Sequence, residues 1–402
     1  MTLKERFPAF TGRNYRLFWT AQFISLTGVW MQSVAQGWLI YKLSMSPAAL
    51  AAAAIALSAP VFVFSVFGGL AADFVDRKKL LVSTQIAASV PALILYYITA
   101  TDKASVEWII ALAAMTGVVN AFEYPARHAM TAEIVTRDKL TSAVTLQAVA
   151  FNATRMIGSS AAGFIIVVSS PAICFLINFV SYLTGALLYS MIEQEAASTG
   201  GDSVKNTRSI ADGIKFILKR RDITGVLIIV AAVSLFGIPF IPMLPLFAEG
   251  VLHSGADGLG MLSGITGAGS MIAAITVACM PEISHKGRNM VFSAFFFAFS
   301  LFLFARSTNL YFSMAALAAA GWGIVCILAL ANCFIQHKCP SHMRGRVMAV
   351  FSFALVGLAP VGHAVMGYSA GKLGVADAVS MSSLICILIV IAGGVNLIKN
   401  PA

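Results

Sequence analysis

The chain has 402 residues, of which 59% are hydrophobic and only 11% carry a charged side chain. Soluble globular domains carry about 25% charged residues, so this composition excludes an ordinary soluble protein and indicates a membrane protein. The 6 Cys, 13 Pro and 32 Gly also exclude the disulfide-rich secreted, disordered and collagen-like classes.

Apolar runs long enough to cross a bilayer core of about 30 Å predict twelve transmembrane helices. The first six are expected at residues 15–41, 47–72, 80–100, 106–124, 140–168 and 171–192. The last six are expected at residues 223–248, 258–280, 289–305, 309–334, 346–371 and 375–398. The sequence thus predicts an all-α membrane protein with an N-terminal six-helix half (1–192), a linker (193–222) and a C-terminal six-helix half (223–402).

The linker between the two halves carries six Lys or Arg residues and is too charged to cross a membrane. Near its end, apolar residues recur at helical spacing opposite basic ones: Ile210, Ile214, Ile217 and Leu218 against Lys215, Lys219 and Arg220. This pattern predicts a short amphipathic helix that lies on the membrane surface.

The formal net charge of +10 follows the predicted topology. With twelve spans both termini lie on one side, and that side carries 22 Lys and Arg residues against 4 on the other, with Arg155 inside a span. Cytoplasmic loops are enriched in Lys and Arg, so the bias predicts a multi-pass protein of the inner (plasma) membrane with both termini in the cytoplasm. It also excludes a nucleic-acid partner. Because the first apolar segment is too long for a signal peptide, we expect it to remain as a helix.

The loop after the second span has a distinctive pattern of glycine, acid and bases: Gly69, Asp73, Arg77 and Lys78. In this spacing the loop resembles the signature of the major facilitator superfamily. Asp76 stands where the signature has a second glycine, a departure found in the subgroup of enterobactin and macrolide exporters. The resemblance extends to residues 31–38, 120–127, 151–155, 244–248, 258–260 and 344–347.

This resemblance implies two six-helix halves around a central cavity that works by alternating access. It further implies a proton-coupled secondary exporter of amphipathic or hydrophobic small molecules, such as drugs or siderophores, acting as a monomer within membrane lipid and without a cofactor. It assigns Gly69, Asp73, Arg77, Lys78 and Arg344 to the cytoplasmic gate. Asp73 is expected to cap the eleventh span, which begins near Arg344, because a carboxylate is stabilised beside a helix N-terminus. The Gly-Pro step usual in the fifth span of antiporters is absent, since Ser159 follows Gly158.

Arg155 is the most costly residue to place, because a guanidinium at mid-span costs at least ~2.5 to 3.5 kcal/mol on insertion scales unless it is paired or faces water. We therefore expect it to line the cavity. Two readings remain open: contact with substrate or gate, or a structural hydrogen bond to backbone carbonyls or to Asn152 three residues earlier.

Two residues are candidates for proton coupling, Glu123 and His363. His363 is the only group at mid-depth whose ordinary pKa, about 6.5, lies near cytoplasmic pH. All the carboxylates lie in loops or near span ends, and Glu123 at the end of the fourth span can pair with Arg127 four residues later, although Pro125 disturbs that helix. For each residue a purely structural role is the alternative.

A mainly apolar cavity with a few polar groups is the expected substrate site. The residues predicted to line it are Trp30, Gln32, Gln36, Asn152, Arg155 and Trp322. Cys333, His337, Cys339 and His342 form a cluster whose spacing matches no standard zinc site, so no metal is expected there.

Other classes of function are open on the sequence. A lysophospholipid or lipid flippase, or a passive facilitator, would also use apolar helices, and a membrane sensor would bind without transport. The sequence has no phosphate-binding GxxxxGK[ST] loop for ATP and no HExxH helix, so an enzyme is not expected.

Overall fold

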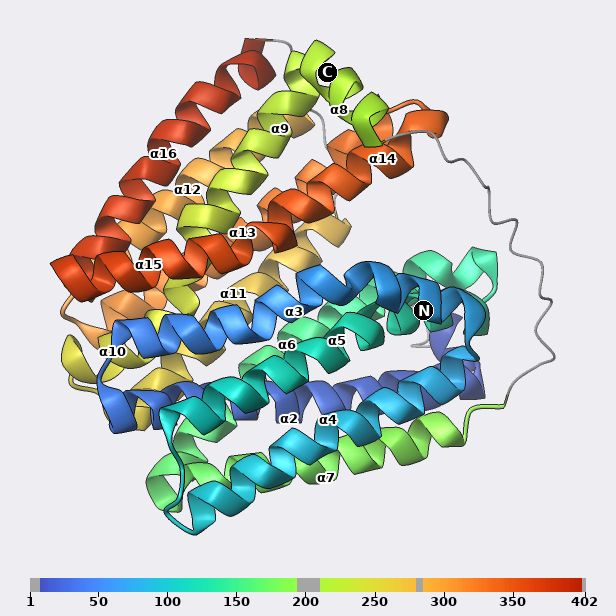
Figure 1. Ribbon diagram of the computed structural model, residues 1–402. Coiled ribbons are helices and arrows are strands. Elements are labelled where there is room, and N and C mark those ends of the chain that lie inside the picture. The colour runs from blue at the N-terminus through green and yellow to red at the C-terminus, as the bar shows by residue number, and fades with distance from the viewer. Residues whose placement is uncertain (1–7, 194–209, 280–284, 400–402) are drawn as a thin grey trace.

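The computed structural model describes residues 8–193, 210–279 and 285–399. Within these residues the regular elements are all helical. Figure 1 shows two groups of helices, one formed by α2 to α7 and the other by α9 to α16. The groups touch at one end and spread apart at the other, which carries the start of α2 and the linker helix α8.

The helices of the first group and the linker helix have the following bounds: η1 Pro8–Thr11, α2 Arg13–Ser44, α3 Pro47–Phe74, α4 Arg77–Ala100, α5 Val106–Ile134, η2 Arg137–Lys139, α6 Leu140–Val168, α7 Pro171–Ser190 and α8 Ile210–Lys219. Those of the second group are α9 Arg221–Ala232, η3 Val233–Gly237, η4 Ile238–Met243, α10 Leu244–Gly250, α11 Gly255–Cys279, α12 Lys286–Arg306, α13 Leu310–Lys338, α14 Ser341–Ser352, η5 Phe353–Gly357, α15 Ala359–Leu373 and α16 Val375–Lys399.

Eleven helical segments in the described part of the chain are long and apolar enough to span a membrane. Among these eleven segments, the elements from α9 to α10 together form one segment, and those from α14 to α15 together form another. The remaining long helix, α2, has 32 residues, but Gln22, Gln32 and Gln36 make it less apolar. Together these elements give the twelve membrane-length segments that the sequence predicts. The protein is a multi-pass all-α membrane protein.

The largest error in the predicted boundaries concerns α5. The sequence predicts a span at 106–124, whereas the helix continues to Ile134 with Pro125 inside it. A proline removes one backbone donor and strains the preceding turn, but it does not always end a helix. The additional turns carry the fourth span well beyond the apolar run.

Two predicted spans are interrupted. The seventh changes from α-helix to the π-helical and 3-10 turns of η3 and η4, where Pro239 and Pro242 cannot donate backbone hydrogen bonds. The eleventh contains the π-helical turn η5 between α14 and α15. Such turns are frequent at functional sites, and hydropathy does not reveal them.

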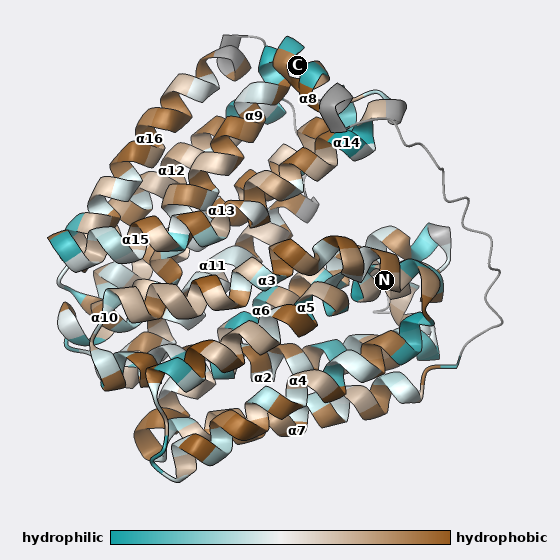
Figure 2. Ribbon diagram, viewed as in Figure 1, coloured by the Kyte–Doolittle hydropathy of each residue, from teal (hydrophilic) through white to brown (hydrophobic). Residues whose placement is uncertain are grey.

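Within the predicted linker the structure has a short helix, α8, at Ile210–Lys219. Its Ile217 is buried, while Leu218 on the adjacent position is 70% exposed. The hydroxyl of Thr224 in α9 donates to the carbonyl oxygen of Ile217 at 2.8 Å. The helix is thus attached to the second group, and Figure 2 shows hydrophilic residues gathered on α8 and α14 at this end.

The most extensive contacts between the two groups are made by two helix pairs, α6 with α11 and α3 with α15. Small residues allow the close approach: a Cβ on Gly163 would lie 2.8 Å from the Cα of Gly260, and one on Gly367 would overlap Ala51. Further along α3, the ring of Phe62 packs against the ring of Phe353 in the other group, with centroids 5.5 Å apart. Closer to the spread end, Phe67 of α3 is 58% exposed.

Candidate functional site

At the end where the groups touch, α2 contacts α10. The Lys42 ammonium lies 3.3 Å from the Glu249 carboxylate and 4.7 Å from the ring centre of Trp38. One turn earlier, a Cβ on Gly37 would lie 3.3 Å from the Pro245 ring. These contacts join the two groups directly, so they must break if this end is to open.

The two neighbouring glycines near the end of α3, Gly68 and Gly69, lie in different environments. A Cβ on Gly68 would overlap the carbonyl of Ala121 in α5, whereas nothing lies within 4 Å of a Cβ on Gly69. The glycine that permits close helix packing here is therefore Gly68. Gly69, the predicted gate residue, makes no such contact in this arrangement of the helices.

The acid and bases of the following loop have separate partners. Asp76 caps α4 by accepting from the backbone N–H groups of Lys78 and Lys79, at 2.9 and 3.2 Å. Arg77 donates to Glu133 of α5 at 2.9 Å, and the Lys78 ammonium donates to the carbonyl oxygen of Ile192 beyond α7 at 2.8 Å. The two predicted gate bases therefore link α4 to α5 and α7.

Asp73 and Arg344, the other predicted gate residues, are both exposed. Neither side chain forms a hydrogen bond or ion pair with a residue that the structure describes. Figure 1 shows the end of α3 and the start of α14 apart from one another. The predicted cap of the eleventh span by Asp73 is therefore not made in this arrangement.

Glu123 and Arg127 form the predicted ion pair within α5. Glu123 is only 2% exposed, and the Arg127 guanidinium also lies 5.8 Å from the ring centre of Tyr124. The Arg127 Nε atom is buried and has no hydrogen-bond partner. The pair confirms the i,i+4 pairing across Pro125 and places a carboxylate deep in the protein, where neutralising it would release Arg127.

His363 lies on α15 and is 8% exposed. Its Nδ1 atom is buried and finds no hydrogen-bond partner in the part of the chain that the structure describes. The preceding residue, Gly362, packs against the carbonyl oxygens of Ser234 and Leu235, which both belong to the π-helical turn η3. The imidazole is therefore an unsatisfied polar group close to both the irregular seventh span and the interface between the groups.

Arg155 lies on α6 with its guanidinium 5.3 Å from the ring centre of Trp30 on α2. Phe151 packs edge-on against the same indole, with centroids 5.3 Å apart. The structural alternative, a hydrogen bond between Arg155 and Asn152, is not formed, and the Asn152 amide donates to the carbonyl oxygen of Ala148 at 2.8 Å. Packing against an aromatic ring replaces that bond.

The remaining predicted cavity residues are dispersed. Gln32 is buried between α2 and α7, where its Oε1 accepts from Asn178 at 2.7 Å, so it stabilises the first group from within. Gln36 is half-buried on α2. Trp322 of α13 packs edge-on against Phe296 of α12 with centroids 5.6 Å apart.

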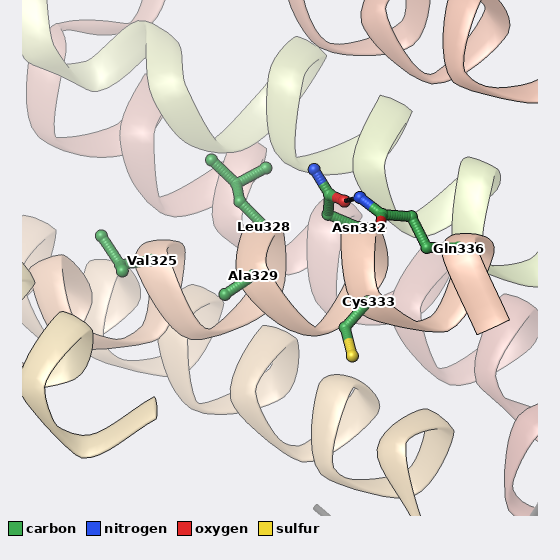
Figure 3. Close-up of a pocket in the computed structure, with 6 residues that line it drawn as sticks. All are labelled: Val325, Leu328, Ala329, Asn332, Cys333 and Gln336. Carbon is green, nitrogen blue, oxygen red and sulfur yellow. Dashed lines mark hydrogen bonds between the residues drawn. The ribbon is translucent and has the colours of Figure 1, made fainter. Parts of the chain in front are cut away.

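A groove of about 480 Å³ runs along one face of α13 (Figure 3). Its lining residues are Val325, Leu328, Ala329, Asn332, Cys333 and Gln336. The Gln336 amide donates to Asn332 at 2.5 Å, and Figure 3 shows these two side chains meeting on one side of the helix while Cys333 points to the other. The sequence analysis did not identify this groove, although two amide side chains four residues apart in an apolar helix, Asn332 and Gln336, could have indicated it. The predicted cavity residue Trp322 lies one turn before Val325 on the same helix.

The cysteine and histidine cluster near the start of α14 offers no set of three metal-binding side chains among the described residues, and the side chain of His342 lies outside them. Burial raises the pKa of the Cys339 thiol, which disfavours the thiolate that zinc requires. Cys333 instead belongs to the groove on α13.

The sequence matches the model of a family described as transmembrane secretion effector over residues 5–400. It is 22% identical over 380 residues to the staphyloferrin A transporter of Staphylococcus aureus, covering 93% of this chain and 94% of that protein. It is also 24% identical over 221 residues to an uncharacterised MFS-type transporter, YfiS, of Bacillus subtilis, covering 54% of this chain and 52% of that one.

Two solved structures share the fold. One is a bacterial homologue of the human lysosomal transporter Spinster in an inward-facing and unoccupied conformation, with a TM-score of 0.69, 9% identity, and coverage of 97% of this chain and 99% of that one. The other is a variant of the nucleoside transporter NupG, with a TM-score of 0.69, 11% identity, and coverage of 96% and 99%.

Proposed function

The chain belongs to the transmembrane secretion effector family of the major facilitator superfamily, and from this premise we propose that it exports amphipathic small molecules by alternating access, driven by the proton gradient. As a member of this family it is a membrane transporter and not an enzyme. The relative that transports staphyloferrin A supports a siderophore or a related natural product as the substrate.

The orientation that we propose places both termini and α8 in the cytoplasm of a cell whose inner membrane holds the protein. The bias of 22 basic residues against 4 supports it. In that orientation the groups spread apart on the cytoplasmic side and touch on the outer side, as expected for a transporter ready to load substrate from the cytoplasm. One chain suffices for the cycle, since each group supplies one half of the pathway.

The buried ion pair of Glu123 and Arg127 carries the proposal of proton coupling. A proton on Glu123 neutralises the carboxylate, leaving Arg127 with an uncompensated charge that favours a different arrangement of the helices. A substrate or a movement of α5 that separates the pair would in turn change the affinity of Glu123 for protons. His363, buried with an unpartnered nitrogen, is the second coupling candidate.

The gate that we propose on the cytoplasmic side consists of Gly69, Asp73, Arg77, Lys78 and Arg344. Arg77 and Lys78 hold the ends of α4, α5 and α7 together, which lets this side move as one body. When the groups close here, Asp73 would cap α14 and stabilise the closed gate through the positive end of that helix.

Transport into proteoliposomes tests the proposal. Labelled staphyloferrin A and an amphipathic dye are supplied to vesicles with and without an imposed pH gradient. We expect accumulation that depends on the gradient and collapses with a protonophore. Equilibration without dependence on pH would identify a facilitator, and movement of a fluorescent lysophospholipid in place of both compounds would identify a lipid flippase.

A further inference from the structure

Arg155 lies on α6 at its contact with α11. On the opposite helix a Cβ at Gly267 would lie 3.2 Å from the Arg155 Cγ, so the aliphatic stem of the arginine belongs to the contact between the two groups. Its charged head lies over Trp30 of α2. The guanidinium is therefore held beside α2 at the contact between the two groups.

The charge of Arg155 is not compensated by any residue in the described part of the chain. Its guanidinium forms no hydrogen bond or ion pair with any residue that the structure describes, although the side chain is half-buried. By contrast Arg127, the other arginine inside the first group, is paired with Glu123. An unpaired cation within a membrane span is costly, and such residues mark binding sites or ion pathways.

A second donor in the same cluster lacks an acceptor. The indole Nε1–H of Trp30 is buried and has no hydrogen-bond partner among the described residues, and Phe151 packs against the ring of that indole. A buried N–H that forms no bond loses the free energy of hydration without replacement. The cluster thus contains two donors without acceptors among the described residues, the guanidinium of Arg155 and the indole N–H of Trp30, beside the rings of Trp30 and Phe151.

We infer that Arg155, Trp30 and Phe151 form the binding subsite for a carboxylate group of the substrate. A guanidinium pairs with both oxygens of a carboxylate, and the indole N–H supplies a further donor. The aromatic rings suit an adjoining apolar body. The substrate class is then an amphipathic organic acid, which rests on the proposed transport function.

Binding of two matched probes to the purified full-length protein in detergent tests the inference by calorimetry. 2-Naphthoate and 2-naphthamide have nearly the same shape but differ in charge. We expect naphthoate to bind about tenfold more tightly than naphthamide, the ratio that one charge-assisted hydrogen bond supplies. Arg155→Gln should abolish that preference, because it lowers the affinity for naphthoate to that for naphthamide. Arg306→Gln, which alters an exposed pair with Asp377 elsewhere, should change neither affinity.

Equal affinity of the wild-type protein for the two probes, or no binding of naphthoate, would overturn the inference, as would a preference that survives Arg155→Gln. If that variant does not fold, Trp30→Phe, which keeps an aromatic side chain and removes the N–H, must weaken naphthoate more than naphthamide. Because binding is measured without transport, a carboxylate preference in a protein that moves no compound would count against the exporter and not against the subsite.

Discussion

Lys42 and Glu249 face each other across the two groups of helices, with the ammonium nitrogen 3.3 Å from a carboxylate oxygen. Lys42 ends α2 and Glu249 ends α10, so the pair joins the first group to the second at the side where they touch. Trp38 supports the ammonium through its ring. Exposed pairs contribute about 0.2 to 1 kcal/mol, which is enough to change the balance between two conformations of similar free energy.

Reversing one charge of this pair should open the touching end. We expect Lys42→Glu to enlarge the population with a long distance between spin labels at Leu43 and Tyr311, both exposed, on a background without native cysteines. The double reversal Lys42→Glu with Glu249→Lys should restore the short distance. The matched control is Arg306→Glu, because its partner Asp377 lies in the same group. An unchanged distance distribution in Lys42→Glu would mean that the pair does not stabilise closure.

The two glycines that end α3 should respond differently to alanine. In Gly68→Ala the new Cβ meets the backbone of α5 at Ala121, which cannot move aside easily, so we expect destabilisation by about 1 to 3 kcal/mol. Gly69→Ala adds a methyl group to open space and should stabilise the helix by up to about 1 kcal/mol. Thermal unfolding of both variants in detergent measures the difference. Equal melting temperatures would contradict the packing described for Gly68.

The features that the sequence predicts well are local. The linker helix α8 and the pair of Glu123 with Arg127 follow from spacing along one helix, and the spans follow from runs of apolar residues. The length of α5 is not predicted, because whether Pro125 ends the helix depends on the packing around it.

Contacts between different helices are not predicted from the sequence. The ring of Trp30 under Arg155 depends on how α2 and α6 are rotated, and the partner of Gln32 lies on α7, 146 residues away. Neither contact leaves a pattern in a single sequence. The sequence therefore identifies the costly residues of the site but does not predict which of them meet.

The proposed orientation predicts which side of the membrane each loop faces. Lys219→Cys on α8 and Lys103→Cys between α4 and α5 place single thiols at opposite ends of the bundle, both exposed. In intact cells an impermeant maleimide should label the thiol at Lys103 and not the one at Lys219. Opening the cells should make both reactive. Labelling of Lys219→Cys alone in intact cells would reverse the topology.

The gate hypothesis predicts a modest effect of Asp73→Asn. A carboxylate at a helix N-terminus stabilises by about 0.3 to 1 kcal/mol, so loss of the charge should lower turnover about two- to fivefold while expression is maintained. Lys79→Gln, an exposed change in the same loop, serves as the control. Turnover in proteoliposomes is the measurement, and unchanged turnover in Asp73→Asn would exclude the cap.

The coupling hypothesis predicts that neutral replacements separate accumulation from passive exchange. Glu123→Gln resembles the protonated carboxylate, so the pair with Arg127 is lost at every pH and a pH gradient can no longer drive accumulation. Downhill exchange should persist, because the pathway itself is intact.

His363→Gln tests the second candidate in the same assay, and Glu107→Gln, an exposed acid at the start of the same helix as Glu123, is the control. Breaking a buried pair can cost about 3 to 5 kcal/mol, so the exchange signal also verifies folding. If both variants accumulate substrate like the wild type, neither residue carries the proton, and a facilitator or lipid flippase becomes the better description of the protein.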